Sequence, residues 1–443
     1  MRKTALVAVG IVFSQSAWAS DKAPPLPWTV NKPIVAVRKE TYKKHPKPKA
    51  AAMASVRYVG PNLEQMEWQA LEIRDDVPDQ PKFRLSMDNG RTWSGFTPLP
   101  PTLSRPKGVE VWEGVGASFY DPVAKVLVDV WLRQIQHKGE HYNFTYWRLS
   151  RDYGKTWSKP KQLRYETGEP FDPNDPLKKS FLTRNRAYFG NNIIRHSNGT
   201  LIHAAAAVNV SADAPNVNPH GVAAYGATTG SRAIGSLCFV GKWNPRKKDY
   251  DWAAGKPVWV PRHVSSRGLM EPEVAELADG RVLVIWRGSN AGLDPAKAPG
   301  RKWFSVSTDG GLTLSPVQEL KYDDGSRFYS PSSIHRMIRH SVTGKLYWIG
   351  NISPGPTQGN SPRYPLIIAE VEETIPALKR NTVTAIDDRT PSQTPAVQFS
   401  NFSLLEDRET HAFELHLTAY GEYADSVYTA DNYKYTLTMP PTR

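Results

Sequence analysis

The stretch that decides the fold is Ser86-Met-Asp-Asn-Gly-Arg-Thr-Trp93, because the same pattern returns as Ser150-Arg-Asp-Tyr-Gly-Lys-Thr-Trp157. A weaker third copy reads Ser307-Thr-Asp-Gly-Gly-Leu-Thr-Leu314. In such a turn the Asp carboxylate accepts backbone N–H bonds, Gly adopts a positive φ, and Trp anchors the next strand to the core. We therefore expect a structural hairpin turn and not a catalytic motif.

The spacing of the copies indicates a repeat of roughly 50–75 residues, enough for one four-stranded antiparallel blade. Apolar strands separated by Gly-containing turns recur between the copies, and no segment has a convincing helical period. The sequence predicts an all-β fold, a β-propeller of six or seven four-stranded antiparallel blades. Six blade starts are visible, near Val56, Val109, Tyr188, Glu271, Tyr329 and Val397. A strand at Ile34 to Val37 is expected to close the last blade, which ends at Tyr433 to Leu437.

Composition limits the kind of protein and its partners. The 443 residues are 40% hydrophobic, which permits a large core, and the single cysteine, Cys238, excludes an intrachain disulfide framework. The net charge of +13 predicts an anionic partner: nucleic acid, membrane or acidic polysaccharide.

The N-terminus narrows that choice. Residues 1–19 have the basic start, apolar stretch and small-residue cleavage site of a signal peptide, so we expect a secreted or periplasmic protein. Residues 20–52 form a Pro- and Lys-rich segment, and 53–443 the β-propeller catalytic domain. No later apolar run is long enough to span a bilayer, so no membrane insertion is expected. The predicted partner is an anionic polysaccharide and not nucleic acid, and the predicted state is a monomer.

Basic residues gather in the loops expected on the face opposite the turn repeats, where strand one begins and strands two and three connect. Such converging loops commonly form ligand sites. Arginine pairs well with carboxylate and sulfate, although any one of these arginines could instead bridge two blades. The loops contribute Arg105, Lys107, His137, Lys138, Glu140, His141, Arg184, Arg186, Tyr188, Arg267, Glu271, Arg287, Arg301, Lys302, Arg327, Tyr329 and Arg363.

The turn repeats resemble the Asp-box repeats of the sialidase superfamily, and the resemblance covers most of the chain. The segment Met270 to Arg287 resembles the one that supplies a catalytic Glu and a carboxylate-binding Arg, which implies these roles for Glu271 and Arg287. Asn360-Ser-Pro-Arg363 resembles the segment of a second such arginine. Where the family has its nucleophilic tyrosine this chain has Phe402, which has no oxygen to attack with, and no Arg-Ile-Pro motif lies near the first blade.

The segment Arg184-Asn-Arg-Ala-Tyr188 resembles the region of secreted ulvan lyases that carries the catalytic tyrosine. The resemblance implies β-elimination between a sulfated rhamnose and a uronic acid. That reaction needs arginine on the uronate carboxylate, a base for the C5 proton and an acid for the leaving oxygen. We expect Tyr188 as the acid, His141 as the base with His137 and His220 as further candidates, and Arg184 and Arg186 among the substrate-binding residues.

Two other functions stay open at this point. One is an exo-acting glycoside hydrolase for sialic acid or a rhamnosyl-glucuronate end, using Glu271, Arg287 and Arg363. The other is a non-catalytic glycan-binding propeller. No cofactor is expected and no spacing predicts a metal site, although a structural ion stays open. His203 and Cys238 lie within apolar strands and are expected in the core.

Overall fold

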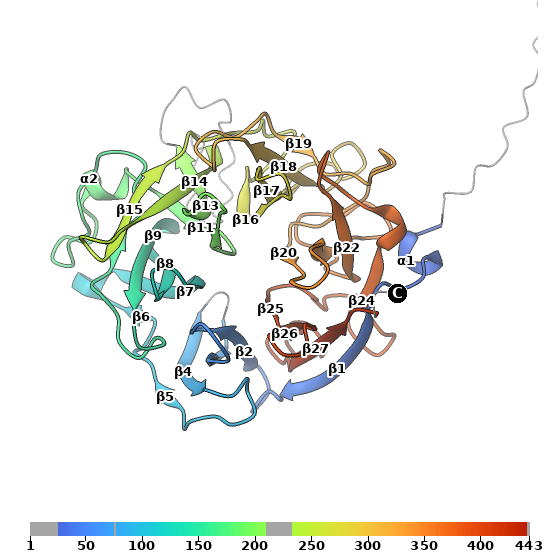
Figure 1. Ribbon diagram of the computed structural model, residues 1–443, viewed down its shortest axis with the longest axis horizontal. Coiled ribbons are helices and arrows are strands. Elements are labelled where there is room, and N and C mark those ends of the chain that lie inside the picture. Colours follow the sequence, from blue (N-terminus) through green and yellow to red (C-terminus); the bar gives the residue numbers. More distant parts are fainter. Residues whose placement is uncertain (1–24, 75–76, 210–232, 441–443) are drawn as a thin grey trace, which may run out of the picture.

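The computed structural model describes residues 25–74, 77–209 and 233–440. These residues form six antiparallel sheets placed around a central axis (Figure 1). The predicted all-β propeller is confirmed, and of the two predicted blade numbers the described residues give six. Five of the six predicted blade starts fall within or before the first strand of a sheet, and Val109 falls between β6 and β7 of the second sheet.

The first three blades occupy the N-terminal half of the ring. Blade 1 contains β2 (Ala51–Tyr58), β3 (Gln65–Glu72), β4 (Pro78–Ser86) and β5 (Thr97–Pro98). Blade 2 contains β6 (Leu103–Ser104), β7 (Glu110–Asp121), β8 (Val126–His137), β9 (Glu140–Ser150) and β10 (Lys161–Gln162). Blade 3 contains β11 (Ala187–Phe189), β12 (Ile194–Arg195), β13 (Leu201–Asn209), β14 (Ala233–Asn244) and β15 (Asp249–Ala254).

The remaining blades complete the circle. Blade 4 contains β16 (Met270–Glu276), β17 (Val282–Arg287), β18 (Lys302–Ser307) and β19 (Gln318–Glu319). Blade 5 contains β20 (Arg336–Arg339), β21 (Leu346–Asn351), β22 (Leu366–Glu372), β23 (Ala377–Leu378) and β24 (Thr384–Asp387). Blade 6 contains β25 (Phe402–Glu406), β26 (Phe413–Thr418), β27 (Asn432–Thr438) and, from the N-terminal segment, β1 (Ala36–Lys43).

Helices are few and short. The described residues contain α1 (Pro27–Val30), α2 (Lys179–Leu182) and two 3-10 turns, Pro106–Gly108 and Arg380–Thr382. No helix in the described ranges has the length and apolar character needed to cross a membrane. The predicted signal peptide and His220 both lie outside the described residues.

The three turn repeats connect β4 to β5, β9 to β10 and β18 to β19, and they share one hydrogen-bond pattern. In the first, Asp88 Oδ1 accepts from the Thr92 backbone N–H at 2.8 Å and Oδ2 accepts from the Thr92 hydroxyl at 2.6 Å. Gly90 follows at φ +79°. The bonds from Thr92 hold the pKa of the Asp88 carboxyl down at about 2. These contacts are local to the turn, as expected of a structural role.

The core lies between neighbouring blades. Trp348 and Ile367 of blade 5 pack against Leu283 and Phe304 of blade 4 in one buried cluster. A second buried cluster joins blades 5 and 6. Burial of each such large side chain contributes about 1.5–3 kcal/mol. Because each cluster draws on two blades, the ring and not the single blade is the stable unit.

The ring closes through both ends of the chain. β1 pairs antiparallel with β27 from Ala36, opposite Thr438, to Lys43, opposite Asn432, and Figure 1 shows the two side by side. A strand from the N-terminal segment does close the last blade, but it is shifted: β1 begins at Ala36, so it contains only the last two residues of the predicted run Ile34 to Val37 and continues through the basic residues that follow. Closure covers an edge of β27 that would otherwise expose unpaired backbone groups.

Candidate functional site

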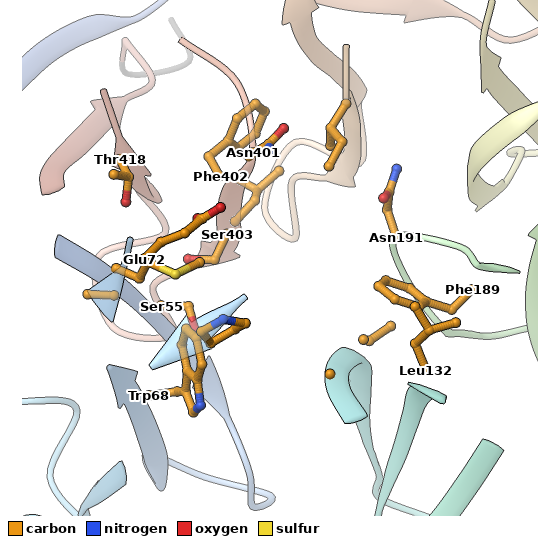
Figure 2. Close-up of a pocket in the computed structure, with 18 of the residues that line it drawn as sticks. Ser55, Trp68, Glu72, Leu132, Phe189, Asn191, Asn401, Phe402, Ser403 and Thr418 are labelled. Atoms are coloured by element: carbon orange, nitrogen blue, oxygen red, sulfur yellow. The ribbon is translucent and has the colours of Figure 1, made fainter. Parts of the chain in front are cut away.

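A cavity of about 540 Å³ lies at the centre of the ring. Its walls come from β2, β7, β11 and β25 and from the loops around them. Figure 2 shows Glu72, Ser55 and Trp68 on one side of this space, with Asn191, Phe189 and Leu132 across from them. Since five of the six blades contribute residues to it, the cavity exists only in the assembled ring.

A tyrosine and a carboxylate form a hydrogen-bonded pair in the cavity wall. Tyr420, which follows β26, donates its phenolic hydrogen to Oε2 of Glu72, the last residue of β3. Both residues are buried and both line the cavity. The pair bridges blades 6 and 1, and no sequence pattern marks either residue.

Two arginines from neighbouring blades meet at one serine. Arg287, at the end of β17, donates from Nε to the Ser332 hydroxyl at 2.8 Å. Arg363, in the loop before β22, donates from Nη2 to the Ser332 carbonyl oxygen at 3.1 Å. Arg287 also forms a buried ion pair with Glu271. The structure therefore brings together three residues that the sequence placed in one candidate site.

Gln398 connects the arginines to the tyrosine. Its side-chain oxygen accepts from Arg363 Nη1 at 2.7 Å, and its backbone N–H donates to the Tyr420 carbonyl oxygen at 2.8 Å. At the other end, Asn191 donates to the Glu271 carbonyl oxygen at 3.0 Å. The resulting hydrogen-bonded series, here called the polar arc, runs through Glu72, Tyr420, Gln398, Arg363, Ser332, Arg287, Glu271 and Asn191.

Glu271 is held in an unusual backbone conformation. Its φ is +44°, in the left-handed region, and the β16–β17 pairing shifts register between Met270 and Glu273. A non-glycine residue there costs about 1–2 kcal/mol, which the surrounding structure must offset. The strain falls where the carboxylate meets Arg287, as is common for residues whose position matters to a site.

Lys302 adds a third cation behind the arginines. Lys302 was expected among the loop residues of an open face, but it lies in β18 and is fully buried. Its ammonium donates to the Ser333 carbonyl at 2.5 Å and the Pro331 carbonyl at 3.3 Å. Burial, and then the nearby Arg287, lower its pKa well below the usual range. Lys302 thus supports the loop that carries Ser332.

Several of the other loop arginines are matched by carboxylates. Arg184 is mostly exposed and pairs with Glu166 at 2.8 Å, and Arg105 pairs with Glu110 at 2.8 Å. Arg301 pairs with Glu319 at 3.3 Å. Part of the excess positive charge expected on this face is therefore compensated locally. Arg57 and Arg336 line the cavity themselves, and Arg363 of the polar arc contacts Gln398 in its wall.

Tyr188 lies where the sequence predicted, at the start of blade 3, and it lines the cavity. Its ring stacks on Phe189 with centroids 4.8 Å apart and packs against a buried cluster that includes Met270, the neighbour of Glu271. Tyr188 is therefore next to one end of the polar arc.

The remaining predicted residues lie in the β8–β9 hairpin, which contains His137 and His141, and in the segment between α2 and β11, which contains Arg184 and Arg186. Arg186 is fully buried and donates from Nη2 to the His141 carbonyl oxygen at 2.9 Å, with its guanidinium over the Tyr142 ring. The hairpin and β11 do meet, as expected of adjacent blades. His137 and His141 are not among the described residues that line the cavity, and neither is Arg184.

His203 and Cys238 are core residues, as predicted. Burial lowers the pKa of His203 to about 4 and raises the pKa of the Cys238 thiol to about 12. Within residues 25–74, 77–209 and 233–440, no group of three or more His, Cys, Asp or Glu side chains is placed to hold a metal ion.

A scan of protein-family models finds no match to this chain, and a search of curated proteins finds none either. Solved structures do match. A protein of unknown function from Dyadobacter fermentans has a TM-score of 0.55 and 16% identity, over 91% of this chain and 99% of that one.

Two sialidase structures match over similar lengths. The NanB sialidase from Streptococcus pneumoniae has a TM-score of 0.55 and 11% identity, over 92% of this chain and 71% of that one. The intramolecular trans-sialidase from Ruminococcus gnavus has a TM-score of 0.51 and 11% identity, over 94% and 98%. At these identities the likeness establishes a shared sialidase-like propeller fold and nothing about activity.

Proposed function

We propose that this chain is a polysaccharide lyase that cleaves an acidic, sulfated polysaccharide of the ulvan type, between a sulfated rhamnose and a uronic acid. The observation that carries the proposal is that Arg287 and Arg363 both contact Ser332. Arg363 also contacts Gln398, which lines the cavity. Two guanidinium groups held in place from two blades suit a planar carboxylate.

The same arrangement suits β-elimination. Arginine contacts neutralise the uronate carboxylate, so the C5–H bond becomes more acidic and the developing charge is stabilised. Tyr188, in the cavity wall, serves in this proposal as the acid that protonates the leaving oxygen. The reaction needs no cofactor, since its atoms balance without one.

The predicted partner follows from charge and export. A net charge of +13 favours an anionic polymer, and the signal peptide expected at residues 1–19 supports a substrate met outside the cytoplasm. We propose that the enzyme works outside the cytoplasm as a monomer, with the central cavity accepting a segment of the chain.

Hydrolysis is the second candidate, and one observation favours it. Glu271 is a buried carboxylate with a strained backbone beside an arginine, an arrangement that also suits an acid-base group acting on a sugar. The propeller fold is shared with sialidases from Streptococcus pneumoniae and Ruminococcus gnavus. An exo-acting hydrolase for an acidic sugar end would use the same arginines.

Product analysis separates these functions. Purified protein is incubated with ulvan, and new reducing ends are measured beside the ultraviolet absorbance of the unsaturated uronate, which only β-elimination creates. We expect both signals to rise together, and Arg363→Gln to lower the rate about 100-fold. Arg148→Gln is the control, since Arg148 pairs with Asp129 in blade 2 outside the polar arc.

Three outcomes would contradict the proposal. Reducing ends without ultraviolet absorbance would establish hydrolysis, which a fluorogenic sialoside and Glu271→Gln would then examine. Binding without any product would establish a glycan-binding propeller. An equal loss in Arg363→Gln and Arg148→Gln would remove the special role of the arginine pair.

A further inference from the structure

Tyr420 and Glu72 are two buried ionisable groups joined in the wall of the central cavity. The phenolic hydroxyl of Tyr420 donates to Glu72 Oε2, and Tyr428 packs edge-on against the Tyr420 ring with centroids 6.4 Å apart. A carboxylate that accepts a phenolic hydrogen bond is placed to take that proton. The pair therefore has the elements of a proton-accepting group.

The pair and the arginines reach the cavity through neighbouring residues. Gln398 accepts from Arg363 through its side chain and donates to the Tyr420 carbonyl oxygen through its backbone, and both Gln398 and Tyr420 line the cavity. None of the described residues that line the cavity is a histidine. Of the described groups, Tyr420 with Glu72 is therefore better placed than His141 to remove a proton from a sugar in this cavity.

Tyr188 lies on the other side of the axis. It belongs to blade 3, whereas Tyr420 belongs to blade 6, and blades 3 and 6 face each other in a ring of six (Figure 1). Figure 2 shows the same separation between Glu72 on one side and Phe189, the neighbour of Tyr188, on the other. A sugar ring in the cavity would present one face to each tyrosine.

We infer that Tyr420 is the catalytic base of this site and Glu72 its positioning residue, an inference that rests on the proposed lyase function. Glu72 takes the phenolic proton, and the phenolate oxygen takes the proton from C5. The electron pair of the C5–H bond forms the C4–C5 double bond, the C4–O4 bond breaks, and the Tyr188 hydroxyl protonates the leaving oxygen. The proton on Glu72 then returns to Tyr188 through solvent.

The opposed tyrosines also determine the stereochemistry. Proton removal at one ring face and protonation of the leaving oxygen at the other is an anti elimination. In an iduronate residue C5–H and C4–O4 lie on opposite faces, whereas in a glucuronate residue they lie on the same face. The enzyme is therefore selective for linkages to the C4 oxygen of iduronate.

The first test compares two oligosaccharides that differ only in the C5 configuration of the uronate. We expect wild-type protein to form the unsaturated product at least 10-fold faster from iduronate than from glucuronate. A preference for glucuronate would overturn the opposed arrangement of base and acid. No unsaturated product from either one would overturn the proposed function, and the inference with it.

The second test separates the base from the acid. Tyr420→Phe and Tyr188→Phe are each given a natural substrate and one with a nitrophenyl ether at C4, whose leaving group needs no proton. We expect Tyr188→Phe to be rescued on the second substrate and Tyr420→Phe to stay at least 100-fold below wild type on both. A wild-type lyase whose Tyr420→Phe variant keeps its rate would overturn the inference and leave the proposed function standing.

The third test concerns Glu72 and has a matched control. Glu72→Gln removes the proton acceptor, so activity is expected only at alkaline pH, where the phenol ionises into solvent. Tyr250→Phe is the control, because Tyr250 donates to Asp121 in a similar buried pair outside the cavity. A Glu72→Gln pH profile that coincides with wild type would reduce Glu72 to a structural role. Thermal unfolding and polysaccharide binding verify that each variant is folded.

Discussion

Glu273 is a fully buried carboxylate whose titration should affect stability. Its Oε1 accepts from Arg336 Nε at 3.2 Å and from the Met337 backbone N–H at 3.1 Å. Burial raises its pKa from 4.5 to about 7, although Arg336 opposes the rise. Because the folded pKa is the higher one, the stabilisation is complete below about pH 4.5 and is lost as pH rises through 7, a change on the order of 3 kcal/mol.

Urea unfolding of wild type and Glu273→Gln at pH 5 and pH 8 measures this effect. We expect wild type to lose stability between these pH values by more than the variant does. Glu276→Gln, three residues along the same strand and partly exposed, is the control. Equal pH dependence in wild type and Glu273→Gln would show that the carboxylate does not titrate in this range.

At the same scale, some site residues were predictable and others were not. The meeting of Arg287 and Arg363 could be expected because each lies in a segment that resembles one family. Tyr420 and Glu72 are 348 positions apart, and no local pattern marks either of them. Only closure of the ring brings the last blade against the first, so their contact depends on tertiary structure that periodicity does not encode.

The loop leading into β16 depends on one glycine. Gly268 has φ +74°, and a Cβ added there would lie 2.0 Å from the Ile234 carbonyl oxygen, a backbone atom that cannot move aside. We expect Gly268→Ala to lower the free energy of unfolding by about 3–5 kcal/mol, since conformational strain and a steric clash add. Gly280→Ala should cost only about 1 kcal/mol, because φ is +83° there but nothing lies within 4 Å.

Chemical denaturation of the two alanine variants compares strain alone with strain plus a clash. A similar loss in both would mean that the loop relaxes freely.

The sequence does not mark Gly268, because the close approach comes from β14, a strand distant in the chain. The turn repeats were predictable as elements because their Asp, Gly and Thr residues form hydrogen bonds within eight residues, and they located blades 1, 2 and 4 correctly.

For the whole molecule, the β1–β27 pairing is the only strand pairing among the described sheets that joins the two ends of the chain. Arg38 lies opposite Thr436, and directly opposed residues of an antiparallel pair are close enough for a disulfide. Cys238, the only native cysteine, is buried and should not interfere. We expect the oxidised Arg38→Cys/Thr436→Cys protein to be more stable by roughly 5 kcal/mol, since the bridge closes a loop of nearly the entire chain.

Thermal unfolding of the oxidised and reduced forms measures that gain, and an Arg38→Ser/Thr436→Ser variant controls for the lost side chains. The core clusters lie between blades, so separation of β1 from β27 should expose one edge and allow neighbouring blades to part in turn. If unfolding begins with the separation of β1 from β27, a disulfide between these strands raises the stability of the protein more than a disulfide elsewhere would. Identical unfolding midpoints for the two forms would mean that unfolding begins elsewhere, with the closing blade still intact.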